Sequence, residues 1–449
     1  MNSCFNKSYL FRPINRNSHI AVLSVKIVSG VPTNSCFIKV WDSRSLRLAS
    51  SLATARQSVV SYKVDEPRKP KKKVALFLGY NGTPYQGMQI NPAAHTVEGV
   101  LFKALCAAGA VSKSNSVDPK KVQLQRAART DKGVHAACNV VSLKMIGYDD
   151  KQMINRINAA LLSDPIRVWG YVETQRSFSA KNSCGSRIYE YMLPSYALKC
   201  LEPIRTLKNT KITLNPSIYH SDFIPLPSSN EELENRQETP SMRYVKLIDT
   251  EKLRSYRIDT ERLERFEAAL SLYKGTHNFH NYTNGKAFED MSANRHIISV
   301  EVNGPKLISG MEWLSVKLHG NSFMIHQIRK MIAMAVLCTR ANSPLTIIPK
   351  SFESTKINIP KAPSSGLLLD RPDFMAYNNL IMLRQKEGTT TKNILSFDVH
   401  QKEIEAFKEQ FLYPHIVKTE IAERVFDTFL ASTEPYLDTN YGYFLSGKS

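Results

Sequence analysis

A single carboxylate lies among several cations in one short stretch of this sequence. Residues 126–137 read Arg-Ala-Ala-Arg-Thr-Asp-Lys-Gly-Val-His-Ala-Ala, and they place Asp131 between Arg129 and Lys132. Gly133 readily adopts the positive φ of a tight turn, so Asp131 is expected at the tip of a hairpin-like turn. A carboxylate that is held at such a tip among cations is a candidate functional group. The alternative is an Asx-turn whose charges are simply solvated.

The segments beside this turn have the patterns of strands that would hold it. Residues 122–125 alternate apolar and polar side chains, and residues 134–145 form a longer run after the turn. Upstream, residues 74–80 are typical of a buried strand, and residues 96–98 begin a helix with an apolar face. The turn that carries Asp131 is therefore expected between two strands.

The rest of the chain alternates further strands and helices. Strands are expected at residues 166–171, 187–193, 297–303 and 313–319, and helices at residues 153–161, 259–273 and 323–338, with an amphipathic segment at 404–430. The order lacks the strict regularity of βαβ units, and the hairpins indicate antiparallel pairs. The pattern predicts an α+β fold.

The composition separates a basic, disordered extension at residues 1–73 and a helical extension at 384–449 from the folded region between them. Residues 225–241 are rich in Pro, Ser, Asn and Glu, which indicates an exposed insertion in that region.

The net charge of +20 indicates a polyanionic partner, most often a nucleic acid. Residues 1–73 hold 14 Lys and Arg against 3 Asp and Glu, so much of the excess lies in the extension and the remaining chain is moderately basic. No apolar run approaches the ~20 residues of a membrane span, so no membrane partner is expected.

The N-terminal residues and the cysteines bear on the compartment. Residues 1–41 contain no Asp or Glu, which is typical of organellar transit peptides, although an untargeted tail fits as well. The basic residues 68–73 fit a nuclear signal, an RNA contact or a solvated lead-in to the fold. Seven cysteines without a CxxC pair argue against disulfides and against a cysteine-rich zinc site. The expected location is the mitochondrion or the nucleus.

Residues 126–137 resemble the catalytic motif of the TruA family of tRNA pseudouridine synthases, whose core is Arg-Thr-Asp-x-Gly-Val-His-Ala. The Ala-Ala pair before Arg129 is similar to the form in the eukaryotic multisite branch. Other segments resemble further family motifs in the same order, namely residues 74–89, 186–191, 275–283, 322–331 and 362–369. The resemblance covers about residues 74–383, and residues 407–430 are also similar to the eukaryotic branch.

The resemblance implies two ferredoxin-like (RRM-like) halves, a first half with Asp131 at residues 74–183 and a second half at 184–383, whose sheets join across a basic cleft. It also implies the isomerisation of uridine to pseudouridine without cofactor or metal, chiefly in and near the tRNA anticodon stem-loop, with other structured RNA as a further partner and a monomer as the favoured state. Three alternatives stay open: a narrower enzyme of the same family that acts on the anticodon arm, a non-catalytic protein that binds or folds RNA, and a structural subunit of an organellar ribonucleoprotein.

By this resemblance, three residues are catalytic. Asp131 would act as a nucleophile at C1′ of the ribose, or as a base on a sugar intermediate. Arg329 would keep that carboxylate ionised, although an arginine beside an apolar helix stripe is more often a surface cation. Tyr189 would stack on the uracil and help to remove the C5 proton.

Three further residues are implied to bind substrate. Arg129 would hold a phosphate or wedge into the RNA stem, and Ile328 would pack on the uracil face unless it is ordinary core. Tyr191 shares a strand face with Tyr189, which also fits a plain cross-strand aromatic pair. His135 is expected to support the turn.

His277 and His280 have the spacing of metal ligands on a helix. No second pair of ligands accompanies them in the sequence, so both are expected to be structural and not to form a zinc site.

Overall fold

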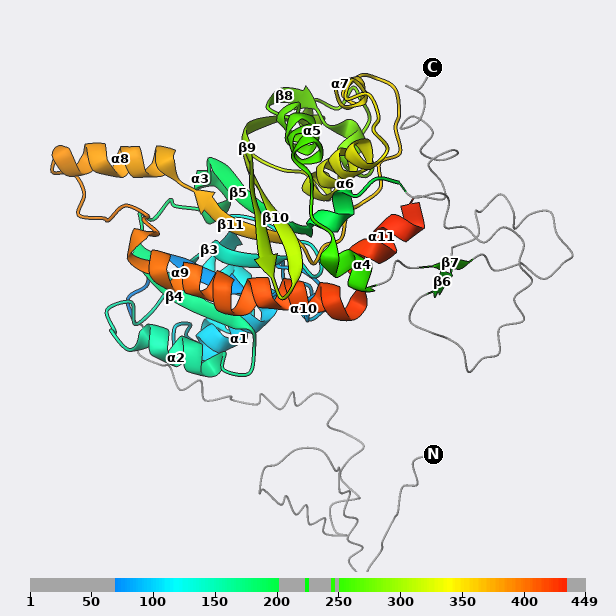
Figure 1. Cartoon of the computed structure of the whole chain (residues 1–449). Helices are drawn as coiled ribbons and strands as arrows, with labels where there is room; N and C mark the ends of the chain where they lie inside the picture. The colour runs from blue at the N-terminus through cyan, green and yellow to red at the C-terminus, as the bar shows by residue number, and fades with distance from the viewer. Residues whose placement is uncertain (1–68, 202–222, 226–243, 247–249, 434–449) are drawn as a thin grey trace, which may run out of the picture. The chain divides into compact units, whose positions relative to one another are not determined.

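The structure is a computed structural model that describes residues 69–201, 223–225, 244–246 and 250–433 (Figure 1). A nine-stranded mixed sheet has the order β4-β1-β3-β11-β5-β10-β9-β8, and β2 pairs with β3 off this path. Its strands are β1 Lys72–Tyr80, β2 Gln125–Arg126, β3 His135–Met145, β4 Ile166–Glu173, β5 Ser186–Pro194, β8 Gly275–Asn278, β9 Asn294–Ile308, β10 Met311–Gly320 and β11 Leu367–Asp373. The short strands β6 Phe223–Pro225 and β7 Tyr244–Lys246 pair with each other.

Helices accompany the sheet along its whole length. They are α1 Val97–Ala107, α2 Met153–Ala160, α3 Ala180–Ser183, α4 Thr250–Ser255, α5 Thr260–Ser271, α6 Gln327–Arg340, α7 Ile347–Lys350, α8 Met375–Lys386, α9 Gln401–Phe407, α10 Tyr413–Glu423 and α11 Val425–Thr433. The helices α9 and α10 run across the strands in Figure 1, joined by a π-helical turn at Lys408–Leu412. No helix among the described residues combines the length and the apolar character that crossing a bilayer needs.

One parallel pair of strands joins two antiparallel groups. Leu368 of β11 pairs with His135 of β3, and Leu369 pairs with Ala136. On one side of this pair lie β3, β1 and β4, and on the other lie β11, β5, β10, β9 and β8, each antiparallel to its neighbours. The expectation of a mixed α+β fold is confirmed.

The core is centred on β1, where every side chain from Val74 to Tyr80 is buried. A strand that is apolar throughout must be covered on both faces. Phe77 meets Phe397 at a ring-centroid distance of 5.2 Å, and Trp169 of β4 meets Phe407 of α9 at 5.3 Å. The C-terminal helices therefore belong to the core of the fold.

Most expected strands and helices are present, and three local expectations are wrong. The strand expected at residues 122–125 begins only at Gln125, as β2, because Pro119–Val122 is a 3₁₀ helix and Gln123 has a φ of 54° that a strand cannot accommodate. The helix expected from residue 323 begins only at Gln327, because His326 has a φ of 64°. His277 and His280 lie in β8 and in the 3₁₀ helix His280–Tyr282, not on one α-helix. Residues 1–68 and most of the expected insertion at 225–241 lie outside the described residues.

Candidate active site

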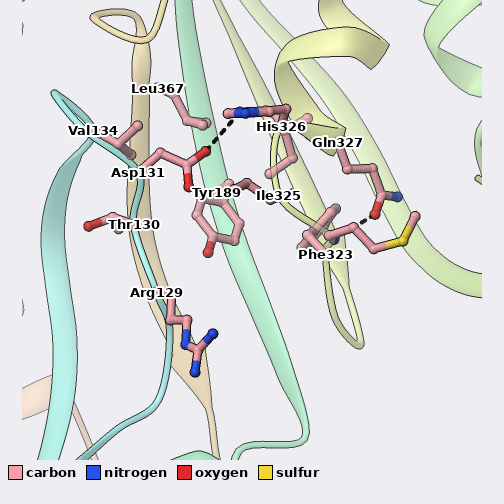
Figure 2. Close-up of a pocket in the computed structure, with 12 residues that line it drawn as sticks. Arg129, Thr130, Asp131, Val134, Tyr189, Phe323, Ile325, His326, Gln327 and Leu367 are labelled. Atoms are coloured by element: carbon pink, nitrogen blue, oxygen red, sulfur yellow. Dashed lines mark hydrogen bonds and ion pairs between the residues drawn. The ribbon is translucent and has the colours of Figure 1, made fainter. Parts of the chain in front are cut away.

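A pocket of about 260 Å³ opens between the turn that carries Asp131 and the loop that precedes α6 (Figure 2). Its wall is mainly apolar and aromatic, with Asp131 as its only carboxylate among the described residues. The lining residues are Arg129, Thr130, Asp131, Val134, Tyr189, Phe323, Met324, Ile325, His326, Gln327, Ile328 and Leu367. A lone carboxylate in such a wall is a candidate for chemistry on a bound ring.

The backbone of the turn is closed on itself and pressed against a neighbouring loop. The Val134 amide donates to the Asp131 carbonyl at 3.2 Å, and Gly133 has the positive φ that the sequence predicts, 76°. The Met88 amide donates to the Thr130 carbonyl at 3.1 Å. Gly87 has a φ of 107°, and a β-carbon there would lie 2.9 Å from that same carbonyl. Only glycine permits this close approach, which fixes the position of the turn relative to the loop that contains Gly87.

Side chains behind the turn hold it from the core. The Tyr80 and Thr130 hydroxyl oxygens lie 2.9 Å apart, and the Asn139 amide donates to the Tyr80 hydroxyl and to the Ala128 carbonyl, at 3.3 and 3.0 Å. Because these groups are buried and mutually hydrogen-bonded, the backbone that leads to Asp131 has little freedom.

His135 follows the turn and lies where the two strand groups meet. Its Nδ1 accepts from the Gly82 amide at 3.1 Å, so Nε2 carries the proton and donates to the Ser365 carbonyl at 3.2 Å. Burial, with a smaller contribution from His415, lowers the pKa of His135 to about 3. The ring is therefore neutral and structural, as its place after the turn suggests.

Among the described residues, the carboxylate of Asp131 contacts one cationic or polar side chain, that of His326. Asp131 Oδ2 lies 3.1 Å from His326 Nδ1, and the two side chains are 29% and 17% exposed (Figure 2). Burial lowers the pKa of His326, and the charge of Asp131 opposes this shift. The histidine is therefore mostly neutral at physiological pH.

Arg329 does not form the ion pair with Asp131 that the family resemblance implies. Its Nε donates to the Ala362 carbonyl at 2.6 Å, and no ion pair joins it to Asp131 in the part of the chain that is described. Burial lowers the pKa of Arg329, while Tyr191 and Asp131 oppose that shift. The cation thus acts on Asp131 through space, beside the pocket wall.

The two tyrosines of β5 occupy different environments. Tyr189 lines the pocket, is 7% exposed, and meets Phe323 edge to face at a centroid distance of 5.3 Å. Burial raises the pKa of Tyr189, so its hydroxyl is neutral. Tyr191 is fully buried and donates to the Pro363 carbonyl at 2.8 Å, and it is absent from the pocket wall.

The remaining expected residues, Arg129 and Ile328, both line the pocket. Ile328 is buried at the start of α6. Arg129 is exposed and makes no hydrogen bond or ion pair with another described residue; Figure 2 shows its guanidinium turned away from Asp131. By contrast, Arg187 donates to the carbonyls of Ala127, Cys184 and Asn321. Arg129 is free to bind a substrate, whereas Arg187 holds the scaffold.

His326 lies inside the motif at residues 322–331, but the motif itself indicates no role for it. The available signal was a titratable side chain three residues before Arg329, directly ahead of a helix.

Among the described residues, no three His, Cys, Asp or Glu side chains gather in a way that could hold a metal ion.

Known proteins resemble this chain over most of its length. A family model described as tRNA pseudouridine synthase matches residues 269–375. The chain is 39% identical over 417 residues to tRNA pseudouridine synthase 1 of Yarrowia lipolytica, covering 85% of this chain and 78% of that protein. It is 36% identical over 464 residues to tRNA pseudouridine synthase 1 of Schizosaccharomyces pombe, covering 84% and 86%. It is 34% identical over 364 residues to pseudouridylate synthase 1 homolog of Mus musculus, covering 80% and 73%.

Proposed function

Because the chain belongs to the family of tRNA pseudouridine synthases, we propose that it isomerises uridine to pseudouridine in tRNA and that Asp131 carries the reaction. The protein is an isomerase. The observation that supports Asp131 is its position as the single described carboxylate of the pocket, at the tip of a turn that is fixed by hydrogen bonds.

The reaction moves one bond of the nucleotide. The bond between N1 of uracil and C1′ of ribose breaks, the base turns, and C5 bonds to C1′; C5 then loses its proton and N1 gains one. Asp131 either adds to C1′ or stabilises and deprotonates a sugar intermediate, and both routes need an ionised carboxylate beside the ribose. A base inside an RNA stem must leave the stack before it can reach such a pocket.

The apolar walls suit a flipped uracil. Tyr189 offers an aromatic ring for stacking, and Ile328 offers an aliphatic surface. Arg129 is an exposed cation at the same pocket, and we propose that it contacts a phosphate or enters the space that the flipped nucleotide leaves. Tyr191 would then support Tyr189 from the core, because its hydroxyl is already bonded to Pro363.

We also propose that the fold consists of two ferredoxin-like halves and that the substrate region is the anticodon stem-loop and its surroundings. The strand order β4-β1-β3-β2 in the first half and β11-β5-β10-β9 in the second supports the first point, since both place the last strand beside the first. The substrate region, a monomeric state and a mitochondrial or nuclear location rest on the resemblance and the basic extension.

The test of this function is Asp131→Asn, which is nearly isosteric but can neither form an ester nor act as a base. Single-turnover pseudouridine formation in tRNA should fall by roughly 10³-fold or more. The thermal midpoint and the tRNA affinity should stay close to wild type. Asp149→Asn, which alters an exposed carboxylate outside the pocket, is the matched control and should keep full activity. Substantial turnover by Asp131→Asn would exclude the assignment.

A further inference from the structure

The side chain of His326 lies directly beside the carboxylate of Asp131. Its Nδ1 lies 3.1 Å from Asp131 Oδ2, and this is the side chain's one contact with a polar group of another described residue. The ring lines the pocket beside Tyr189 and Ile325 (Figure 2). A structural histidine such as His135 instead has both ring nitrogens engaged with the backbone.

The backbone at His326 has a conformation that favours other residues. Its φ of 64° and ψ of −3° place it in the third position of a tight turn, which the Gln327 amide closes on the Met324 carbonyl at 3.1 Å. The Gln327 side chain accepts from the Met324 amide at 2.9 Å and reinforces this turn. Glycine and asparagine are the usual residues there. Histidine is tolerated at such a φ more readily than most residues, and backbone conformations of this kind recur at functional sites.

We infer that His326 is a positioning residue for Asp131, whose imidazole lies at ion-pair distance from one carboxylate oxygen, orients the carboxylate and leaves the other oxygen for the ribose. This role rests on the proposed function. Nδ1 is buried and not yet aligned for a hydrogen bond, and such contacts often tighten when substrate binds. A proton on Nδ1 of the neutral ring makes the contact attractive, whereas a lone pair there would be repelled by the carboxylate. A carboxylate that is held by one oxygen presents the other in a fixed direction, which is what a reaction at a sugar carbon requires.

The charges around His326 determine its effect at different pH values. Asp131 faces it from the turn, Arg329 from α6, and Lys361 from the segment before β11; the pocket also contains Arg129 and Tyr189. Burial and the two cations Lys361 and Arg329 lower the pKa of His326, and Asp131 opposes them. In acid, the imidazolium would pair with Asp131 and reduce its reactivity. The rate should therefore rise with pH below the ordinary histidine pKa and then remain level.

Two variants isolate the side chain from the turn. His326→Gly and His326→Asn both accept a φ of 64°, so neither should strain the backbone. Asparagine keeps an N–H donor near the position of Nδ1 but does not titrate, and glycine keeps no donor. The measurements are single-turnover pseudouridine formation in tRNA between about pH 5 and 8, tRNA affinity, and the thermal midpoint of the full-length chain.

We expect the Gly variant to lose roughly 10- to 100-fold in rate with nearly unchanged tRNA affinity. The Asn variant should recover most of the rate and should lose the inflection that wild type shows in acid. Wild-type rate in the Gly variant would overturn the inference, as would an Asn variant that is as slow as Gly or that keeps the inflection. Inactivity of the wild-type protein on tRNA would instead count against the proposed function, so the two failures are distinguishable.

Discussion

Strand β5 presents neighbouring side chains to two very different sets of charges. Tyr189 lines the pocket where Asp131 and His326 are 29% and 17% exposed. Glu190, the next residue, faces the opposite side of the sheet. There it meets Lys408 at 2.9 Å, and these two side chains are 4% and 2% exposed.

The two sets differ most in how completely their carboxylates are bonded. Glu190 accepts from the Ser315 hydroxyl at 2.6 Å and from the Tyr413 hydroxyl at 2.9 Å, in addition to its ion pair. Lys408 also pairs with Asp370 at 2.9 Å. The Asp131 carboxylate, by contrast, contacts only the side chain of His326 in the part of the chain that the structure describes. A saturated, buried carboxylate is structural, whereas a partly exposed one with unused lone pairs is available for chemistry.

Lys408 connects the C-terminal helices to two neighbouring strands, β5 and β11. Burial would lower the pKa of Lys408, but Asp370 and Glu190 outweigh it and raise the pKa above its ordinary value. The lysine therefore remains charged between β5 and β11, which carry these two carboxylates. Its π-helical turn lies between α9 and α10, so the cluster fixes that segment to the sheet.

The largest effect on stability is expected for Lys408→Met, which leaves two buried carboxylates without their cation. Removal of one partner from a buried ion pair costs about 3–5 kcal/mol. Urea denaturation should show this loss, while the single-turnover rate of the folded fraction should change little. Lys402→Met, at an exposed position of α9, is the matched control. Equal stability of the two variants would show that the cluster of Lys408, Glu190 and Asp370 does not stabilise the fold.

The next largest effect is expected on the catalytic rate, from a change at Arg329 beside the pocket. Arg329→Lys keeps a positive charge but loses the planar guanidinium and the Nε–H bond to Ala362. We expect the single-turnover rate to fall roughly 10- to 100-fold with little change in tRNA affinity, because many phosphate contacts share the binding.

Arg129 provides the contrasting control for this experiment. Arg129→Ala should weaken tRNA binding and lower its salt dependence by about one counterion, as expected for an exposed cation on a phosphate. Affinity at two salt concentrations and the single-turnover rate distinguish the two arginines. If Arg329→Lys turned over normally and Arg329→Ala showed the reduced salt slope, Arg329 would be a phosphate contact outside the chemistry.

The sequence predicts the pocket around Asp131 and Tyr189 far better than the buried charge cluster on the opposite face of β5. The turn around Asp131 is local: its glycine, its following strand and the strand of Tyr189 all follow from residue types at short spacing. The cluster of Lys408, Glu190 and Asp370 is not local, because it joins residues as many as 218 positions apart, and periodicity carries no information about such pairs. The contact of His326 with Asp131 is likewise not local, because it joins residues that are 195 positions apart in the sequence.

The smallest effect is expected from removal of the N-terminal extension. Residues 1–68 hold 10 Lys and Arg against 3 Asp and Glu, yet the described fold begins just after them, with β1 at Lys72. A chain that begins at Lys69 should therefore keep the single-turnover rate and tRNA affinity of the full chain within about twofold, since the phosphate contacts expected at the pocket remain. Any change in location within cells would then reflect targeting.

A second start point sharpens this test, because the first residues of β1 already belong to the fold. Lys72 pairs with Glu173 at 2.9 Å, and Lys73 is buried and donates to the Gln123 carbonyl at 3.1 Å. A chain that begins at Val74 loses both contacts and should be less stable than the chain from Lys69, with an unchanged rate for the folded enzyme. Sharply weaker tRNA binding with a reduced salt slope in the chain from Lys69 would contradict this expectation, because it would assign RNA contacts to the extension.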